Sequence, residues 1–149
     1  MRALIDTNIP LDFVLQRAPH DAHAARIIDA CDRGAFDGCI AAHSIINIDY
    51  ILRKSIPPQG ERLKCLRYFC KIFTVQPVGL EELAEALDNE SFKDFEDCVQ
   101  WCCAQAFDAD CIITRNVKDF AAASIPAISP DEFCRRFLAA EEGTGGHSQ

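Results

Sequence analysis

The sequence predicts an α/β protein with a central parallel β-sheet of about five strands that is covered by helices on both faces. Two observations support this prediction. Short apolar runs alternate with segments of helical periodicity from end to end, which is the signature of a parallel sheet between two helical layers. The chain has 149 residues, 49% of them apolar, which is enough to bury the core of one ordinary domain.

The first third of the chain begins with a buried strand. Residues 2–6 (Arg-Ala-Leu-Ile-Asp) have the apolar centre of a short buried strand and lead directly into Thr7 and Asn8. Pro10 suits the first turn of a short helix that continues to Leu15. Apolar residues then recur at helical spacing over residues 21–33, and Gly34 is placed to end that helix.

The middle of the chain repeats this alternation. Residues 37–42 form a second apolar run, and Ser44 is expected to cap the helix that follows. That helix, at about residues 44–54, ends before Pro57 because proline cannot continue a helix. A further helix is predicted over residues 59–73. These two apolar helices could form a dimer face or simply cover the sheet.

The last part supplies three more strands and three more helices. Strands are predicted at residues 74–78, 111–114 and 125–128, and helices at residues 80–88, at 92–107 and from Pro130 onward. No domain boundary or internal repeat interrupts this pattern. We therefore predict one domain over residues 1–138, followed by a disordered tail over residues 139–149 that is poor in apolar residues.

The net charge limits the possible partners. Lys and Arg number 15 and Asp and Glu number 23, which gives 15 − 23 = −8. A non-specific binder of duplex DNA would present a basic face, so this composition argues against one. It is compatible with a nuclease, because an acidic metal pocket contributes to the same negative charge.

The nine cysteines are expected to be buried, reduced thiols of a cytoplasmic protein. Their number is odd, and they show neither the paired Cys-x-x-Cys spacing nor the Cys-His spacing of a zinc site. The amino-terminal residues MRALIDTN carry one basic residue and no long apolar run, which does not resemble a secretion signal. No segment approaches the roughly 18 consecutive apolar residues of a membrane span, so no membrane partner is expected.

Polar side chains gather where the predicted strands end. The first strand ends in Asp6, Thr7 and Asn8, and the second is followed by the helix that carries Asn47. The strand at residues 111–114 leads into Thr114, Arg115 and Asn116, with Lys118 and Asp119 just after it. Since ligands of parallel sheets bind beyond the carboxyl ends of the strands, these residues are candidates for one site.

Two acids at the start of the helix at residues 92–107 complete the candidate site. Asp94 and Asp97 are three residues apart and are expected to share one helical face, with Glu96 pointing elsewhere. We expect Asp6, Asp97 and the 114–119 turn to converge on an acidic pocket. Mg²⁺ or Mn²⁺ would relieve the repulsion between such carboxylates, lower the pKa of a bound water and stabilise charge on a phosphodiester.

Simpler roles are open for the same residues. Asp94 and Asp97 could complement the dipole of their helix, and Asn116 and Asp119 could be turn formers. His20, His23 and His43 have no nucleophile beside them, so solvated or capping roles are expected. The chain lacks the GxGxxG and GxxxxGK[ST] patterns, which removes the main support for a dinucleotide or P-loop site.

Three segments together resemble the PIN domain, and most closely its bacterial branch of VapC-type toxins and PilT N-terminal-like ribonucleases. They are Asp6-Thr7-Asn8 after the first strand, Phe95-Glu96-Asp97 at a helix start, and Thr114-Arg115-Asn116-Val117-Lys118-Asp119-Phe120. The resemblance extends over about residues 1–138. It implies a three-layer PIN-like fold and a Mg²⁺- or Mn²⁺-dependent ribonuclease. It also implies a homodimer, often the toxin of a toxin–antitoxin pair, so an antitoxin protein and RNA are the expected partners.

The resemblance also assigns roles to individual residues. Asp6 and Asp97 correspond to the first and third metal-binding acids, Asn116 takes the place of the fourth, and Asp119 lies close by as a further catalytic candidate. Asn47 stands where the family commonly has a glutamate, so two acids of the usual set are amides. Asp94 is the expected source of the missing carboxylate. Supporting roles are expected for Thr7, Asn8, Asn47, Thr114 and Arg115.

Two functions are therefore carried forward, together with a third that is disfavoured. The first is a metal-dependent endoribonuclease for single-stranded RNA, with Arg115 and Lys118 contacting phosphate and Arg53 and Lys54 extending the basic track. The second is a catalytically weakened PIN-fold module that binds RNA or a protein partner. A phosphorylated receiver domain is disfavoured because no aspartate ends the strands at residues 37–42 and 74–78.

Overall fold

The computed structural model, which describes residues 1–139, contains one five-stranded sheet in which all neighbouring strands are parallel. The strand order is β3-β2-β1-β4-β5. The strands are β1 (Arg2–Ile5), β2 (Asp37–Ala41), β3 (Thr74–Gln76), β4 (Cys111–Ile113) and β5 (Ala127–Ile128). The predicted α/β class and five-stranded parallel sheet are confirmed.

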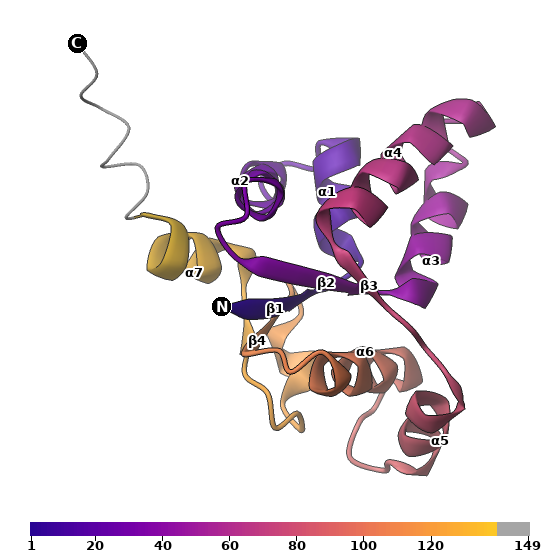
Figure 1. The fold of residues 1–149 in the computed structure, drawn as a ribbon, viewed down its shortest axis with the longest axis vertical. Helices are drawn as coiled ribbons and strands as arrows, with labels where there is room; N and C mark the ends of the chain where they lie inside the picture. Colours follow the sequence, from indigo (N-terminus) through magenta and orange to yellow (C-terminus); the bar gives the residue numbers. More distant parts are fainter. Residues whose placement is uncertain (140–149) are drawn as a thin grey trace.

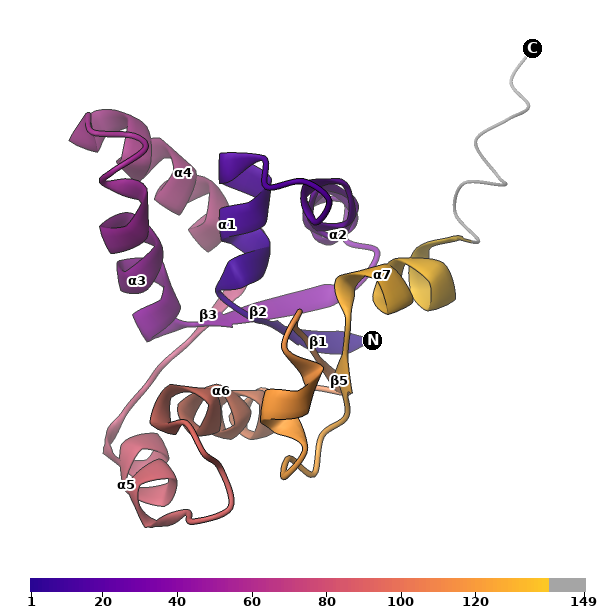
Figure 2. The same ribbon diagram turned by 180° about the vertical axis from the view of Figure 1, so that it is seen from behind.

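Helices cover both faces of this sheet, as Figures 1 and 2 show. One layer holds α1 (Asn8–Leu15), α2 (Asp21–Asp32), α3 (Ala42–Leu52) and α4 (Gln59–Ile72). The opposite layer holds α5 (Leu80–Asp88) and α6 (Phe95–Ala106), with the short 3₁₀ helix η1 (Val117–Phe120) beside α6. The chain then reaches α7 (Pro130–Phe133) and the π-helical turn η2 (Cys134–Leu138), which pack against α2.

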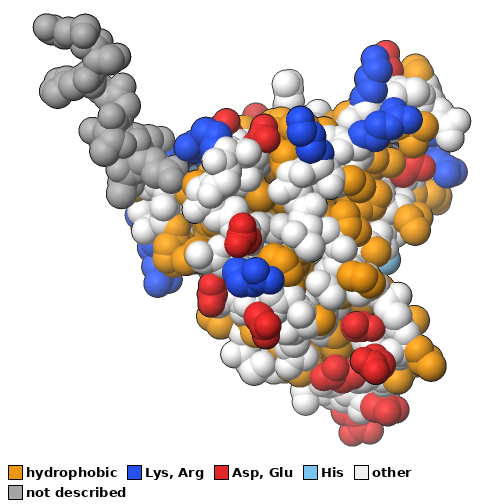
Figure 3. All heavy atoms as spheres, viewed as in Figure 1, with side chains coloured by type: hydrophobic (Ala, Val, Ile, Leu, Met, Phe, Trp, Pro, Cys, Tyr) orange, Lys and Arg blue, Asp and Glu red, His pale blue; other side chains and the backbone are white. Residues whose placement is uncertain are grey.

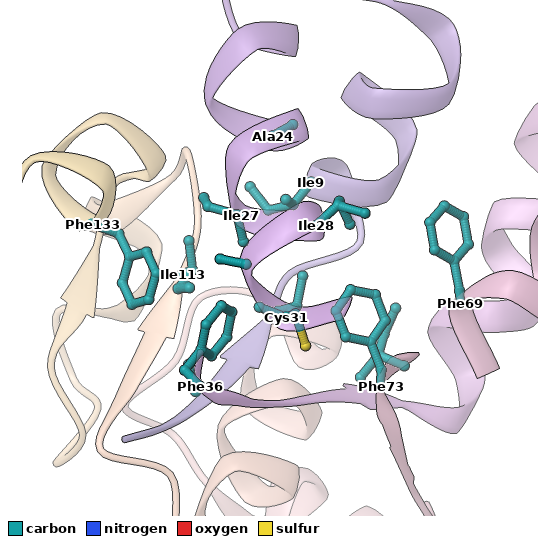
Figure 4. Packing of buried hydrophobic residues seen from close by; sticks show 14 of the residues in the cluster. Ile9, Ala24, Ile27, Ile28, Cys31, Phe36, Phe69, Phe73, Ile113 and Phe133 are labelled. Atoms are coloured by element: carbon teal, nitrogen blue, oxygen red, sulfur yellow. The ribbon is translucent and has the colours of Figure 1, made fainter. Parts of the chain in front are cut away.

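The larger part of the core fills the space between the sheet and the α1–α4 layer. Figure 4 shows Ile9, Ile27 and Ile28 from α1 and α2 in this space together with the aromatic rings of Phe69 and Phe73. All five belong to one buried cluster, and each is at most 3% exposed. A second cluster on the opposite face packs α6 against the sheet. Burial of side chains on both faces explains why the central strands are short and apolar throughout.

The element boundaries differ from the prediction in two places that matter for the site. The helix predicted from residue 92 begins at Phe95, because Asp94 has an extended backbone (φ −122°, ψ 127°) and caps it. The helix predicted from Ser44 begins at Ala42, directly after β2. Ser44 therefore lies inside α3 and is fully buried, so the predicted capping role is wrong.

The cysteines, all within residues 1–139, are thiols rather than disulfides, and seven of the nine are buried. Burial raises the pKa of Cys39, Cys102 and Cys103 to about 12. These side chains are thus small hydrophobic groups of the core, as predicted. Over the described part of the chain, no helix has the length and apolar character that crossing a bilayer requires. The predicted tail lies outside the described residues except for Ala139.

Candidate metal centre

Asp6 lies at the centre of the sheet, where β1 ends between β2 and β4. Its side chain is 6% exposed, and two groups donate hydrogen bonds to it. The backbone N–H of Thr7 donates to Oδ1 at 2.7 Å, and the buried Thr114 hydroxyl, just after β4, donates to Oδ2 at 2.8 Å. Burial nevertheless raises the pKa of Asp6, and the nearby charge of Glu96 contributes to the increase.

A cleft of about 390 Å³ opens beside Asp6 and is lined by residues from four parts of the fold. Thr7, Asn8, Asn47, Asp97 and Asn116 line it together with Asp6. The structure thus brings together Asp6 and Asp97, which are two of the three aspartates predicted as metal ligands. Both amides that replace family acids and two of the supporting residues line the same cleft. The parallel topology explains this convergence, because the carboxyl ends of β1, β2 and β4 meet at one edge of the sheet.

The remaining predicted acids line a neighbouring cleft, also of about 390 Å³. Asp94, Lys118 and Asp119 face this second cleft, and Asp97 is the predicted site residue that lines both. Asp94 also accepts a hydrogen bond from the backbone N–H of Asp97 at 2.9 Å, which makes it the N-cap of α6. The helix-terminal role considered from the sequence is therefore present for Asp94.

Asp97 is surrounded by negative charge. Partial burial raises its pKa to about 7, and the charges of Asp94, Glu96, Asp6 and Asp119 contribute to the increase. One side-chain oxygen from each of Asp94, Glu96 and Asp97 lies within 4.8 Å of the others. All of these donors are oxygen atoms, which are the ligands that Mg²⁺ and Mn²⁺ prefer. The residues present therefore fit a hard divalent cation.

Glu96 is a site residue that the sequence analysis missed. It lines the same cleft as Asp6 and Asp97, so the expectation that it points elsewhere is wrong. His43, expected to be solvated or capping, donates from Nε2 to Glu96 Oε1 at 3.0 Å. The expectation about Glu96 was wrong because α6 was predicted to begin too early. Asp94 precedes the helix, so it does not share a helical face with Asp97.

Arg115 does not line the cleft with Asp6. Its guanidinium pairs with Asp12, a buried aspartate of α1, at 2.8 Å, and Arg17 approaches the same carboxylate at 3.6 Å. The local sequence pattern does not mark Asp12 as a paired residue. Its two partners lie five and 103 residues away, and the apolar pattern of α1 surrounds it. Arg53, predicted to extend a basic track, pairs with Asp49 at 3.5 Å on α3.

Comparison with family models gives a match to the PIN domain over residues 2–118. The chain belongs to the PIN domain family. This confirms the resemblance seen in the sequence motifs. A search of curated proteins found no match.

Solved structures that share this fold include chains of toxin–antitoxin proteins. A toxin–antitoxin complex from Klebsiella pneumoniae contains a chain that is 22% identical, with a TM-score of 0.63 over 86% of this chain and 97% of that one. A chain of VapBC2 from Rickettsia felis, bound to a promoter DNA fragment, is 14% identical, with a TM-score of 0.65 over 87% of this chain and 98% of that one. A chain of FitAcB from Neisseria gonorrhoeae is 16% identical, with a TM-score of 0.61 over 86% of this chain and 97% of that one. At these identities the likeness shows the fold alone.

Proposed function

We propose that this protein is a metal-dependent endoribonuclease that hydrolyses phosphodiester bonds of single-stranded RNA. The observation that supports it most directly is the cleft where Asp6 and Asp97 meet at the carboxyl edge of the sheet. Membership of the PIN family, which is a family of nucleases, supports hydrolysis of nucleic acid in general. In this proposal Mg²⁺ or Mn²⁺ would be held by Asp6 and Asp97.

The protein's own residues have distinct roles in this mechanism. A bound ion would lower the pKa of a coordinated water and stabilise negative charge on the phosphodiester. Thr7 and Thr114 fix both oxygens of Asp6 by hydrogen bonds, so the carboxylate keeps one orientation. Asn47 and Asn116 line the cleft and offer neutral amide groups to substrate or water. Lys118, exposed at the rim of the neighbouring cleft, is suited to contact phosphate.

The biological role proposed here is that of the toxin of a type II toxin–antitoxin pair, acting as a cytoplasmic homodimer. The support for an antitoxin partner is that similar folds occur in toxin–antitoxin complexes. On the face of the molecule that Figure 3 shows, acidic side chains gather over α5, and basic ones lie where α3 and α4 meet. Arg53 and Lys54 belong to the segment between α3 and α4, which suits an approach of the RNA backbone from that side.

Cleavage of a fluorescent single-stranded RNA tests this proposal. We expect wild-type protein to cut with Mn²⁺ or Mg²⁺ and to stop in EDTA, and Asp6→Asn to be inactive in either metal. Glu90→Gln, which neutralises an exposed carboxylate ahead of α6, is the matched control and should cut normally. Activity that survives Asp6→Asn would contradict the proposed site.

A second function is favoured by the two amides in the cleft. Asn47 and Asn116 carry no charge and cannot serve as bases, so the same fold could bind RNA or a protein partner without cutting. Folded wild-type protein that retains a labelled RNA in a filter-binding assay, but cleaves none of several sequences with either metal, would support this function instead.

A further inference from the structure

Glu96 occupies a position in the cleft that the proposed mechanism does not yet use. It lies in the first turn of α6, beside Asp97, and lines the cleft with Asp6. Asn47 of α3 lines the same cleft and stands where the family commonly has a glutamate. The cleft therefore has a carboxylate on α6 and an amide on α3.

The Glu96 carboxylate is held from two different helices. His43 of α3 and Gln100 of α6 both donate to its Oε1, each at 3.0 Å. Gln100 is fully buried, and its position one turn after Glu96 is fixed by the packing of α6 on the sheet. Two donors on rigid elements restrict a carboxylate in the way that the supporting residues of metal sites do.

The same contacts link Glu96 to Asp6. The Gln100 amide also lies 3.1 Å from Ser44 Oγ and 3.3 Å from Thr7 Oγ1, and the Thr7 hydroxyl donates to Ser44 at 2.8 Å. The N–H of Thr7 in turn donates to Asp6. This polar cluster of Thr7, Ser44 and Gln100 joins the segment between β1 and α1 to α3 and α6, and Thr7 also lines the cleft. Hydrogen bonds between buried polar groups favour one relative position of these elements.

From these contacts we infer that Glu96 supplies the carboxylate that Asn47 lacks, and that it binds the divalent ion together with Asp6 and Asp97. The inference rests on the proposed metal-dependent function. It assigns to α6 a ligand that the family commonly places on α3, with His43 and Gln100 as positioning residues. Asp94, which caps α6 and lines the neighbouring cleft, is then a structural residue.

Calorimetric titration with Mn²⁺ tests this inference without relying on activity. Glu96→Gln keeps the shape of the side chain and an oxygen that can accept both hydrogen bonds, so it removes the charge alone. We expect Mn²⁺ affinity to fall at least tenfold. Glu81→Gln is the matched control, because Glu81 is an exposed glutamate in the first turn of α5, and its affinity should stay within twofold of wild type.

A second substitution tests whether Glu96 binds the ion or only holds His43 in place. Asn47→Glu, introduced into Glu96→Gln, returns a carboxylate to the cleft from α3 without rebuilding the contacts of Glu96. We expect it to restore most of the lost Mn²⁺ affinity. Should Glu96→Gln unfold, Glu96→Asp replaces it in both titrations, since it keeps the charge but withdraws it by one methylene.

The outcomes distinguish this inference from the function on which it rests. Wild-type protein that binds no Mn²⁺ would refute the metal-dependent function and the inference together. Wild-type binding that Glu96→Gln leaves unchanged would refute the inference alone. Weakened binding that Asn47→Glu does not restore would give Glu96 a structural role and would also overturn it.

Discussion

Replacing Asp97 by asparagine is expected to stabilise the metal-free protein at pH 8 and to remove its response to Mn²⁺. The pKa of Asp97 is about 7, compared with 3.8 for an ordinary aspartate. A difference of about three pH units corresponds to about 4 kcal/mol at 1.36 kcal/mol per unit. Because the side chain is partly exposed, solvent screens these charges, and we reduce the figure to about 1–2 kcal/mol.

One opposing effect must be subtracted. Asp97 lies in the first turn of α6, where a negative charge is stabilised by the helix dipole by about 0.3–1 kcal/mol. The net gain of Asp97→Asn is therefore about 1 kcal/mol at pH 8. For a domain of this size, that corresponds to a rise in unfolding temperature of about 2–4 °C.

The dependence on pH has a definite sign. The folded-state pKa is raised above the unfolded value, so the folded state holds the Asp97 proton more tightly. The cost of ionising Asp97 is absent below about pH 4, grows as the pH rises toward 7, and is complete above it. The advantage of Asp97→Asn over wild type should therefore be larger at pH 8 than at pH 5.

Thermal denaturation in EDTA, followed by circular dichroism at both pH values, measures this advantage. Mn²⁺ should raise the unfolding temperature of wild type and leave that of the variant nearly unchanged. Glu90→Gln, which changes an exposed residue that lines neither cleft, should match wild type under every condition. A lower unfolding temperature for Asp97→Asn at pH 8, or an equal gain at both pH values, would refute the reasoning about crowded carboxylates.

Three further predictions concern the ion, the support of Asp6 and the sheet. Only about a tenth of Asp97 is ionised at pH 6 if its pKa is about 7, so the apparent Mn²⁺ affinity, measured by titration, should be roughly tenfold weaker at pH 6 than at saturating pH. Thr114→Val removes the buried hydrogen bond to Asp6 and should cost about 1–3 kcal/mol in urea unfolding, whereas Thr114→Ser should cost less. Gly38→Ala in β2 would place a methyl group 2.8 Å from the Cys31 sulfur and 3.1 Å from the Phe73 ring. We expect it to destabilise by about 1–3 kcal/mol, and wild-type stability in the same urea titration would contradict the packing described.

The residues whose meeting was predicted from the sequence are those whose position follows from strand ends. Asp6 and Thr114 directly follow buried strands that proved to be neighbours, so their meeting required only the parallel topology. Asn47 and Asn116 reached the same cleft for the same reason.

The residues that were missed depend on features that a pattern does not specify. The direction of the Glu96 side chain depends on where α6 begins, and the cap at Asp94 shifted that start by about three residues from the predicted position. His43 and Ser44 were misjudged because α3 follows β2 with no intervening loop. Asp12 and Arg115 meet through a contact between residues more than a hundred positions apart, which no local pattern predicts.

The central place of β1 also determines when a newly made chain can acquire its site. β1 pairs with β2, which is synthesised soon after it, but its other neighbour is β4, which is made much later. The hydroxyl that fixes Asp6 belongs to Thr114, just beyond β4. A chain still growing on the ribosome therefore carries Asp6, Glu96 and Asp97 before it can assemble them. The cleft is completed only after β4 has left the ribosome, when most of the chain has already been translated.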